Sequence, residues 1–178
     1  VVTGIGLVTP LGCNVSESWS RLIQGKSGIS TISRFDTSNL PVKIAGLVPD
    51  TFDPDMSVKE QKRVDRFIIL GVSAAVQAIE DSGWKPEDEE SRDRTGVIIG
   101  SGIGGLPCIY ETSIAFFQKG ARQVSPFFIP ASLINIASGS VSIRYGFSGP
   151  NHSVVTACAT GTHAIGDAAR LIQYGDAD

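Results

Sequence analysis

Several features that would mark particular protein classes are scarce in this chain of 178 residues. Its three cysteines, Cys13, Cys108 and Cys158, are an odd number without C-x-x-C spacing, which argues against a disulfide framework or a zinc site and favours a reducing compartment. A net charge of −3 without a basic stripe argues against binding to nucleic acid. No unbroken apolar run is long enough to span a membrane. No signal or transit segment is visible and no initiator methionine precedes Val1, so we expect residues to be missing before it.

Acidic side chains are absent over a long segment, from Thr112 to Gly166, that is rich in serine, alanine, glycine, isoleucine and aromatic residues. They crowd instead between Asp81 and Asp93, where Pro86-Glu-Asp-Glu-Glu90 is typical of a solvated loop. A segment so poor in charge is usually buried in the domain core, in a subunit interface or around an apolar substrate. We expect an interface or a substrate site.

Hydrophobic residues make up 42% of the chain, and strand-like segments alternate with helix-like ones. Apolar strands without alternation indicate burial on both faces, and the strand–helix order implies right-handed crossovers. We therefore expect one α/β domain with a mainly parallel mixed sheet and helices on both faces. Strands are expected over 1–3, 43–45, 95–99 and 153–157, with an extended segment over 126–130. Helices are expected over 14–25, 57–83, 108–118, 131–143 and 162–174, the first two capped by Asn14 and Ser57.

The most informative motif surrounds Cys158, in Ser153-Val-Val-Thr-Ala-Cys-Ala-Thr-Gly161. A β-branched run ends at the cysteine, and small residues lead from there into a helical pattern. A sharp strand-to-helix turn holds a thiol at the helix N-terminus, where unpaired amides and the positive end of the dipole favour a thiolate. The pattern predicts an activated nucleophile with a backbone oxyanion hole nearby. The alternative is a buried structural cysteine.

Neither of the two histidines offers an obvious base for that nucleophile. His152 precedes the expected strand, and His163 lies five residues after Cys158 on the following helix. Because a five-residue helical offset points mostly away from the sulfur, we expect both histidines to be structural. Either the helix dipole generates the thiolate, or the base lies outside these residues.

A competing motif is Gly100-Ser-Gly-Ile-Gly-Gly105, which satisfies G-x-G-x-x-G directly after an expected strand. The dinucleotide-binding fingerprint also needs an acidic residue roughly 20 positions further on. Glu111 is too close, and no other acidic residue follows until Asp167. We favour the alternative that these glycines let the backbone turn close to a pocket, with Ile103 projecting into it.

Taken together, the motifs resemble those of the β-ketoacyl-acyl carrier protein synthases. Val1-Val-Thr-Gly-Ile-Gly6 with Thr9-Pro-Leu-Gly12 is similar to the family's opening, and Thr156-Ala-Cys-Ala-Thr-Gly161 resembles its nucleophile motif. Further similar segments are Gly25-Lys-Ser-Gly-Ile29, Gly100-Ser-Gly-Ile-Gly-Gly105, Ser125-Pro-Phe-Phe-Ile-Pro130, Gly149-Pro-Asn151 and Tyr174-Gly-Asp-Ala-Asp178. The resemblance runs from Val1 to Asp178 and is strongest to the elongating type II synthase of dissociated fatty-acid synthesis.

This resemblance implies a thiolase-like fold, in which residues 1–178 are the nucleophile-bearing first of two similar halves and the second half is absent from the sequence. It implies a homodimer, with the charge-poor region near Pro126 to Ile143 contributing to the interface and the acyl pocket. It also implies an acyl carrier protein as the partner that delivers acyl and malonyl groups, and no cofactor or metal. A bacterial cytoplasm is the expected compartment, with a mitochondrion or plastid as the alternative.

The implied activity is that of a 3-oxoacyl-acyl carrier protein synthase in fatty-acid elongation. Cys158 would take the acyl group as a thioester, and loss of carbon dioxide from malonyl-carrier protein would give the enolate that attacks it. Ile103 and Phe128 match positions that line the acyl channel in the family. The two histidines that assist the reaction in the family lie in the second half, and His152 and His163 do not replace them. We therefore expect the isolated chain to lack condensing activity.

Three function classes stay open from the sequence: a condensing enzyme, a non-catalytic chain-length partner on the same fold, and a dinucleotide-dependent oxidoreductase. The retained Cys158 argues against the second class, and the missing acidic residue after Gly105 argues against the third. Polyketide-type ketosynthases share the motifs and remain an alternative within the first class.

Overall fold

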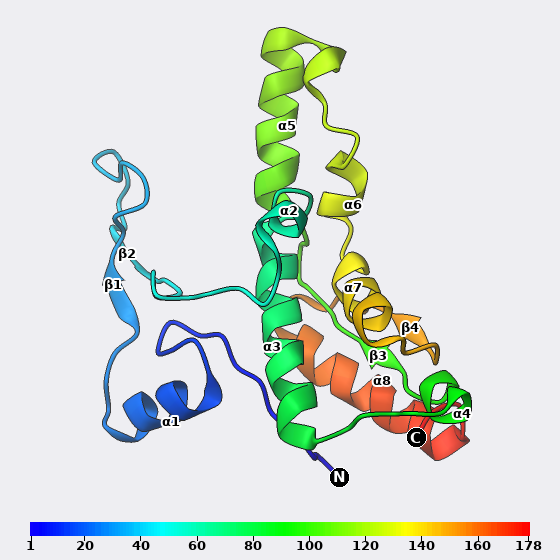
Figure 1. The fold of residues 1–178 in the computed structure, drawn as a ribbon. Coiled ribbons are helices and arrows are strands. Elements are labelled where there is room, and N and C mark those ends of the chain that lie inside the picture. The colour runs from blue at the N-terminus through cyan, green and yellow to red at the C-terminus, as the bar shows by residue number, and fades with distance from the viewer. The chain divides into compact units, whose positions relative to one another are not determined.

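The computed structural model describes all residues, 1–178, and they form two compact units (Figure 1). One unit comprises Val1–Pro54 with Ser73–Trp84, and the other comprises Asp55–Val72 with Lys85–Asp178. The helices are α1 Val15–Ile23, α2 Val58–Gln61, α3 Arg66–Ser82, α4 Glu89–Asp93, α5 Leu106–Lys119, α6 Phe128–Ser132, α7 Ile136–Tyr145 and α8 Thr160–Tyr174. The strands are β1 Ile29–Thr31, β2 Ile44–Gly46, β3 Val97–Ile98 and β4 Asn151–His152. Two short 3₁₀ helices are η1 Ala121–Gln123 and η2 Ala157–Ala159.

The first unit contains α1, the antiparallel β1–β2 pair and the C-terminal part of α3. Asn14 accepts a hydrogen bond from the Glu17 amide (2.8 Å) and caps α1 as predicted. The Glu17 carboxylate accepts a hydrogen bond from the Cys13 amide (3.0 Å), which fixes the entry of the chain into the helix. The strand expected over 43–45 is confirmed as β2, one residue further along.

The N-terminal segment of this unit runs along α3 and does not form the expected strand. The Ile5 amide donates to the Asp81 carboxylate (2.9 Å), and the Leu7 amide donates to the Gln77 side-chain oxygen (3.3 Å). Side chains of α3 therefore satisfy these amides in place of a neighbouring strand. A methyl group at either glycine of Gly4-Ile-Gly6 would collide with backbone carbonyls of α3, so the close approach explains this motif.

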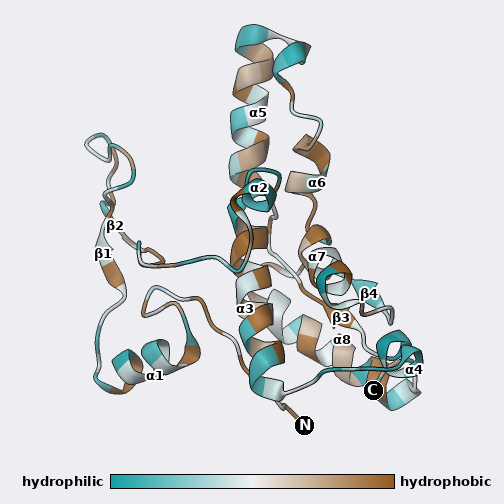
Figure 2. Cartoon of the chain, viewed as in Figure 1, coloured by the Kyte–Doolittle hydropathy of each residue, from teal (hydrophilic) through white to brown (hydrophobic).

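The second unit is built around the parallel pair of β3 and β4. α7 packs against both strands, and α8 packs against β3. Figure 2 shows β3 as hydrophobic. The core of this unit includes buried apolar side chains of α3, β3 and α7, namely Ile68, Val72, Val97, Ala137 and Val141. The acidic segment 86–90 is a loop only as far as Asp88, because polar α4 begins at Glu89. Asp88 caps α4 by accepting a hydrogen bond from the Ser91 amide (2.7 Å). These layers confirm the expected α/β class.

Both β pairs are shorter than the sequence pattern predicts. The strand expected over 153–157 is wrong in position, because pairing ends at His152. Beyond it, the Ser153 hydroxyl donates to the Ile99 carbonyl oxygen (2.5 Å), so a side chain takes the place of a ladder hydrogen bond. The parallel pair therefore ends several residues before Cys158, and the intervening chain is irregular.

The extended segment expected over 126–130 is wrong, because residues 126–127 form a turn and α6 begins at Phe128. Pro130 is the third residue of α6, where its missing N–H has no intrahelical acceptor to lose. Leu133 is extended (ψ 133°) and ends α6, so α7 begins at Ile136 and not at 131 as expected. No helix in the structure combines the length and the apolar character needed to cross a membrane.

Candidate active site

Cys158 lies on a turn directly before α8, as the sequence predicts. It is the middle residue of η2, and its side chain is exposed, so the alternative of a buried structural cysteine is wrong. Ala159 is the N-cap residue of α8 and makes no side-chain hydrogen bond, which leaves the positive end of the helix dipole beside the thiol. The Cys158 amide donates no hydrogen bond within the chain. It is therefore free to donate to an oxyanion that forms on a bound substrate.

The residue before the cysteine has an unusual backbone conformation. Ala157 has φ +49°, and no other residue besides glycine has a positive φ. For a residue with a Cβ atom this region costs about 1–2 kcal/mol, and such residues persist where the surrounding structure holds them. The turn resembles a nucleophile elbow, in which a strained strand-to-helix turn presents the reactive side chain at its tip.

The glycine-rich loop 100–105 packs directly against this turn. A methyl group at Gly100 would collide with the Thr160 side chain and lie 2.6 Å from the Val154 carbonyl oxygen. A Cβ atom at Gly102 would lie 3.6 Å from the Ala157 Cα atom, at ordinary contact distance. This close approach supports the interpretation that the glycines serve backbone packing beside a pocket.

The same loop leads into α5, and the carboxylate of Asp65 is hydrogen-bonded to an amide in the first turn of this helix. Asp65 is buried and accepts a hydrogen bond from the Cys108 amide (2.9 Å). A dinucleotide fold needs this helix N-terminus for the pyrophosphate, and a built-in carboxylate there repels phosphate. The geometry of α5 thus argues against the dinucleotide-dependent oxidoreductase.

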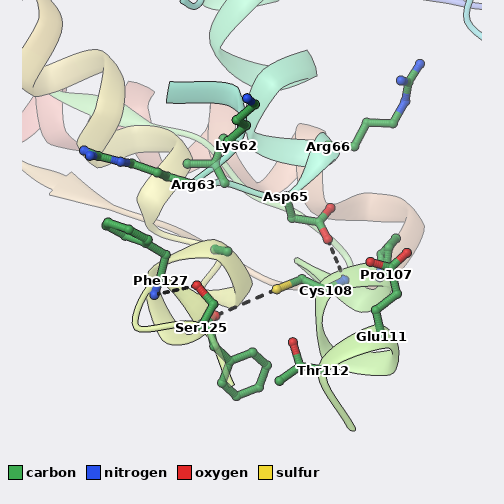
Figure 3. Close-up of a pocket in the computed structure, with 13 residues that line it drawn as sticks. Lys62, Arg63, Asp65, Arg66, Pro107, Cys108, Glu111, Thr112, Ser125 and Phe127 are labelled. Atoms are coloured by element: carbon green, nitrogen blue, oxygen red, sulfur yellow. Dashed lines mark hydrogen bonds between the residues drawn. The ribbon is translucent and has the colours of Figure 1, made fainter. Parts of the chain in front are cut away.

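The two predicted channel residues lie in different surroundings. Ile103 is on the glycine-rich loop beside the Cys158 turn and is 66% exposed. Phe128 is half-buried at the start of α6 and lines a hollow of about 320 Å³ together with Cys108 and Arg63 (Figure 3). Cys158 does not line that hollow. Their substrate contacts remain predictions.

Both histidines make no hydrogen bond to the cysteine, in line with the prediction that they are structural. His163 is on α8, where its Nδ1 atom lies 3.2 Å from the Thr156 hydroxyl oxygen. Its Nε2 atom lies 3.4 Å from an Asp167 carboxylate oxygen, one helical turn further on. The four-residue spacing of His163 and Asp167 could have predicted their contact from the sequence. No sequence pattern predicts the positive φ of Ala157.

Comparisons with known proteins agree with this geometry. The family described as "Beta-ketoacyl synthase, N-terminal domain" matches residues 1–178. The 3-oxoacyl-[acyl-carrier-protein] synthase 2 of Rhizobium meliloti is 52% identical over 186 residues, which cover 100% of this chain and 44% of that protein. The mitochondrial 3-oxoacyl-[acyl-carrier-protein] synthase of Arabidopsis thaliana is 46% identical over 196 residues, covering 100% of this chain and 42% of that protein. The chain thus spans less than half the length of these relatives.

Two solved structures have a similar fold. The ishigamide ketosynthase/chain length factor superposes with a TM-score of 0.85 at 26% identity, covering 100% of this chain and 45% of its own. A type II PKS acyl-carrier protein in complex with its ketosynthase gives a TM-score of 0.73 at 26% identity, covering 100% of this chain and 47% of its own.

Proposed function

This chain belongs to the β-ketoacyl synthase family, whose N-terminal domain it matches throughout and whose thiolase-like fold it shares, and from this premise we propose that its parent protein is a 3-oxoacyl-acyl carrier protein synthase of fatty-acid elongation. The observation that carries the proposal is the placement of Cys158. Its exposed thiol and free amide lie together at the uncapped N-terminus of α8. That arrangement suits a nucleophile that must stabilise an oxyanion next to itself.

The first step of the proposed reaction transfers the acyl group to the enzyme. The Cys158 thiolate attacks the thioester carbonyl carbon of the acyl-carrier protein, and its own amide donates to the oxyanion of the tetrahedral intermediate. Collapse of the intermediate breaks the bond to the carrier's sulfur, which leaves as a thiolate and takes up a proton. The acyl group is then held as a thioester on Cys158, and the carrier departs.

The second step forms the new carbon–carbon bond. Malonyl-carrier protein loses carbon dioxide, and the resulting enolate carbon attacks the thioester carbonyl on Cys158. The cysteine leaves as the thiolate, and the 3-oxoacyl product is two carbons longer than the starting acyl group. In the family, two histidines of the second half assist decarboxylation, so we assign that task to the part of the protein beyond residues 1–178. This chain supplies the nucleophile and the oxyanion donor.

Fatty-acid elongation is favoured over polyketide synthesis by the pattern of similarity. The curated relatives at 46–52% identity are 3-oxoacyl-[acyl-carrier-protein] synthases. The ketosynthase of the type II PKS complex is 26% identical to this chain. A non-catalytic chain-length partner is disfavoured because Cys158 is present and exposed.

The proposed partners are an acyl carrier protein and a second copy of the protein. A solved ketosynthase is bound to an acyl-carrier protein, which supports the first. The charge-poor segment supports the second, because it exposes large apolar side chains that a subunit interface would cover, including Phe117, Ile129, Leu133 and Ile143. Ile103 and Phe128 are proposed to line the acyl channel of that assembly.

We propose the bacterial cytoplasm as the compartment, with a mitochondrion or plastid as the alternative. The relatives include bacterial enzymes and a mitochondrial plant enzyme. The three cysteines are free thiols, which suits a reducing compartment.

The decisive test is the intact mass of the full-length parent protein after mixing with a long-chain acyl-carrier protein. We expect an increment equal to one acyl group on the wild-type protein and none on Cys158→Ala, with the acyl group located on the Cys158 peptide. An increment that persists on Cys158→Ala, or no increment on a folded wild-type protein, would falsify the proposal. The non-catalytic partner would then become the leading interpretation.

A second expected outcome concerns the chain on its own. Residues 1–178 incubated with acyl- and malonyl-carrier proteins should release no 3-oxoacyl product, because the decarboxylation machinery lies outside them. Product is measured by mass spectrometry, with the full-length parent as the positive control. Condensation by the isolated chain would place the complete machinery within these residues and contradict the assignment.

A further inference from the structure

We propose that the Thr160 hydroxyl group is a positioning group that holds the strained turn beneath Cys158, with His163 holding the Thr156 hydroxyl of the same turn. The proposal rests on the proposed role of Cys158 as the acyl-accepting nucleophile. It assigns a specific task to two residues of α8 that do not touch the reacting atoms. The task is to keep Ala157 at its positive φ, which places the Cys158 thiol and amide together.

The Thr160 hydroxyl bridges the two residues before the nucleophile. It accepts a hydrogen bond from the Thr156 amide (2.9 Å) and donates one to the Ala157 carbonyl oxygen (2.8 Å). The φ and ψ bonds of Thr156 and of Ala157 lie between these two backbone groups, so a single hydroxyl restrains the turn across both residues. A serine or threonine hydroxyl is the side chain that donates and accepts at once at this size.

The position of Thr160 is itself rigid. Its side chain is 5% exposed and lies where a side chain at Gly100 would be. It occupies the first residue of α8, so the helix backbone fixes its Cα atom. A buried hydroxyl that both donates and accepts a hydrogen bond has a defined orientation. We call the two hydrogen bonds from Thr160 to Thr156 and Ala157 the clasp.

His163 restrains the side chain of the same segment. Its ring bonds to the Thr156 hydroxyl at Nδ1, and Asp167 lies against Nε2. The Nδ1 contact restrains the Thr156 hydroxyl, so Thr156 is restrained both at its amide and at its hydroxyl. Together the first two turns of α8 hold the chain on the approach to Cys158.

The test uses the full-length parent protein and the rate at which iodoacetamide alkylates Cys158, read from the mass of its peptide. Thr160→Val keeps the shape but removes the hydroxyl, and we expect alkylation to slow by about 10- to 100-fold as the thiol loses its place at the helix N-terminus. Thr160→Ser restores the hydroxyl and should recover most of the rate. Thr162→Val is the matched control, because it makes the same substitution at an exposed threonine two residues further along α8.

A double variant separates the clasp from a simple loss of stability. Glycine adopts positive φ without the Cβ penalty, so Ala157→Gly combined with Thr160→Val should recover much of the lost rate. It also keeps the test valid if Thr160→Val alone does not fold. Equal rates for Thr160→Val and the wild type, equal slowing of Thr160→Ser, or no recovery in the double variant overturns the proposal.

Acyl transfer from a long-chain acyl-carrier protein is measured on the same variants. A parallel loss and recovery of the acylation rate supports both the clasp and the proposed function. If the wild-type protein is alkylated at Cys158 but not acylated, the proposed function fails while the alkylation series still decides the clasp. If acylation occurs and the alkylation rates are all equal, the clasp fails and the proposed function stands.

Discussion

At the scale of single residues, the site is determined by how closely backbones approach each other. Gly100 and Gly102 both face the Cys158 turn, but a methyl group would meet a different environment at each of them. At Gly100 it would collide with Thr160, whereas at Gly102 it would make ordinary contact with Ala157. Both glycines lack a positive φ, so the space around them is the decisive difference.

This pair gives a matched prediction. Gly100→Ala should lower the free energy of unfolding by about 1–3 kcal/mol, because the added methyl group overpacks the contact with Thr160. Gly102→Ala should leave the free energy of unfolding within about 0.5 kcal/mol of the wild type. Urea unfolding followed by circular dichroism measures both in the full-length protein. Equal destabilisation by the two substitutions would contradict the packing described here.

At the scale of elements, one buried carboxylate connects the starts of two helices. Asp65 accepts hydrogen bonds from the Phe67 amide of α3 (3.3 Å) and the Cys108 amide of α5 (2.9 Å). Figure 3 shows its side chain directed at the start of α5. Arg63 next to it lies over the Phe127 ring, 4.7 Å from its centroid, which ties the same corner to the chain before α6.

Removing this carboxylate should therefore loosen two helices at once. Asp65→Ala is expected to lower the free energy of unfolding by about 1–3 kcal/mol, because two amides and their buried surroundings lose their acceptor. Asp88→Ala is the control, since Asp88 caps only the short α4 and should cost about 1 kcal/mol or less. Chemical unfolding curves compare the two variants. A smaller loss for Asp65→Ala than for Asp88→Ala would contradict the bridging role.

At the scale of the second unit, an ion pair joins the residue after α4 to the chain after α8. Arg94 follows α4 and donates two hydrogen bonds to the Asp178 carboxylate (2.6 and 2.5 Å) and one to the Gly175 carbonyl oxygen (3.2 Å). The hydrogen bonds from Arg94 lower the pKa of the Asp178 carboxyl below its ordinary value of 3.8. The end of α8 is thereby held beside the start of the β3 segment.

The pKa of Asp178 has a consequence for stability against pH. A carboxyl group whose folded pKa is depressed stabilises the fold above its unfolded pKa and loses that contribution as pH falls through the folded value. Stability should therefore decrease below about pH 4, and Asp178→Asn should flatten that decrease. Arg94→Gln should flatten it equally, because it removes the other partner. Thermal unfolding between acid and neutral pH measures the slopes. Unchanged slopes in either variant would contradict the assignment.

The sequence by itself determined the features that depend on local chemistry. The caps at Asn14 and Ser57, the start of a helix after Cys158 and the family membership all follow from short stretches of neighbouring residues. A capping side chain and the amide that it accepts from are separated by three residues, so their interaction is encoded where it occurs. The pattern at Cys158 likewise predicted a thiol at a helix N-terminus, whereas its exposure was seen only in the structure.

Only the tertiary structure decided the features that join residues far apart in the chain. The positive φ of Ala157, the collision that excludes a side chain at Gly100 and the bridge from Asp65 to α5 depend on segments brought together by folding. The strand expected over 153–157 failed for the same reason, because a strand needs a partner and β-propensity cannot say where pairing ends. The place of Cys158 directly before a helix could be predicted from its neighbours, but the contacts that hold its turn could not.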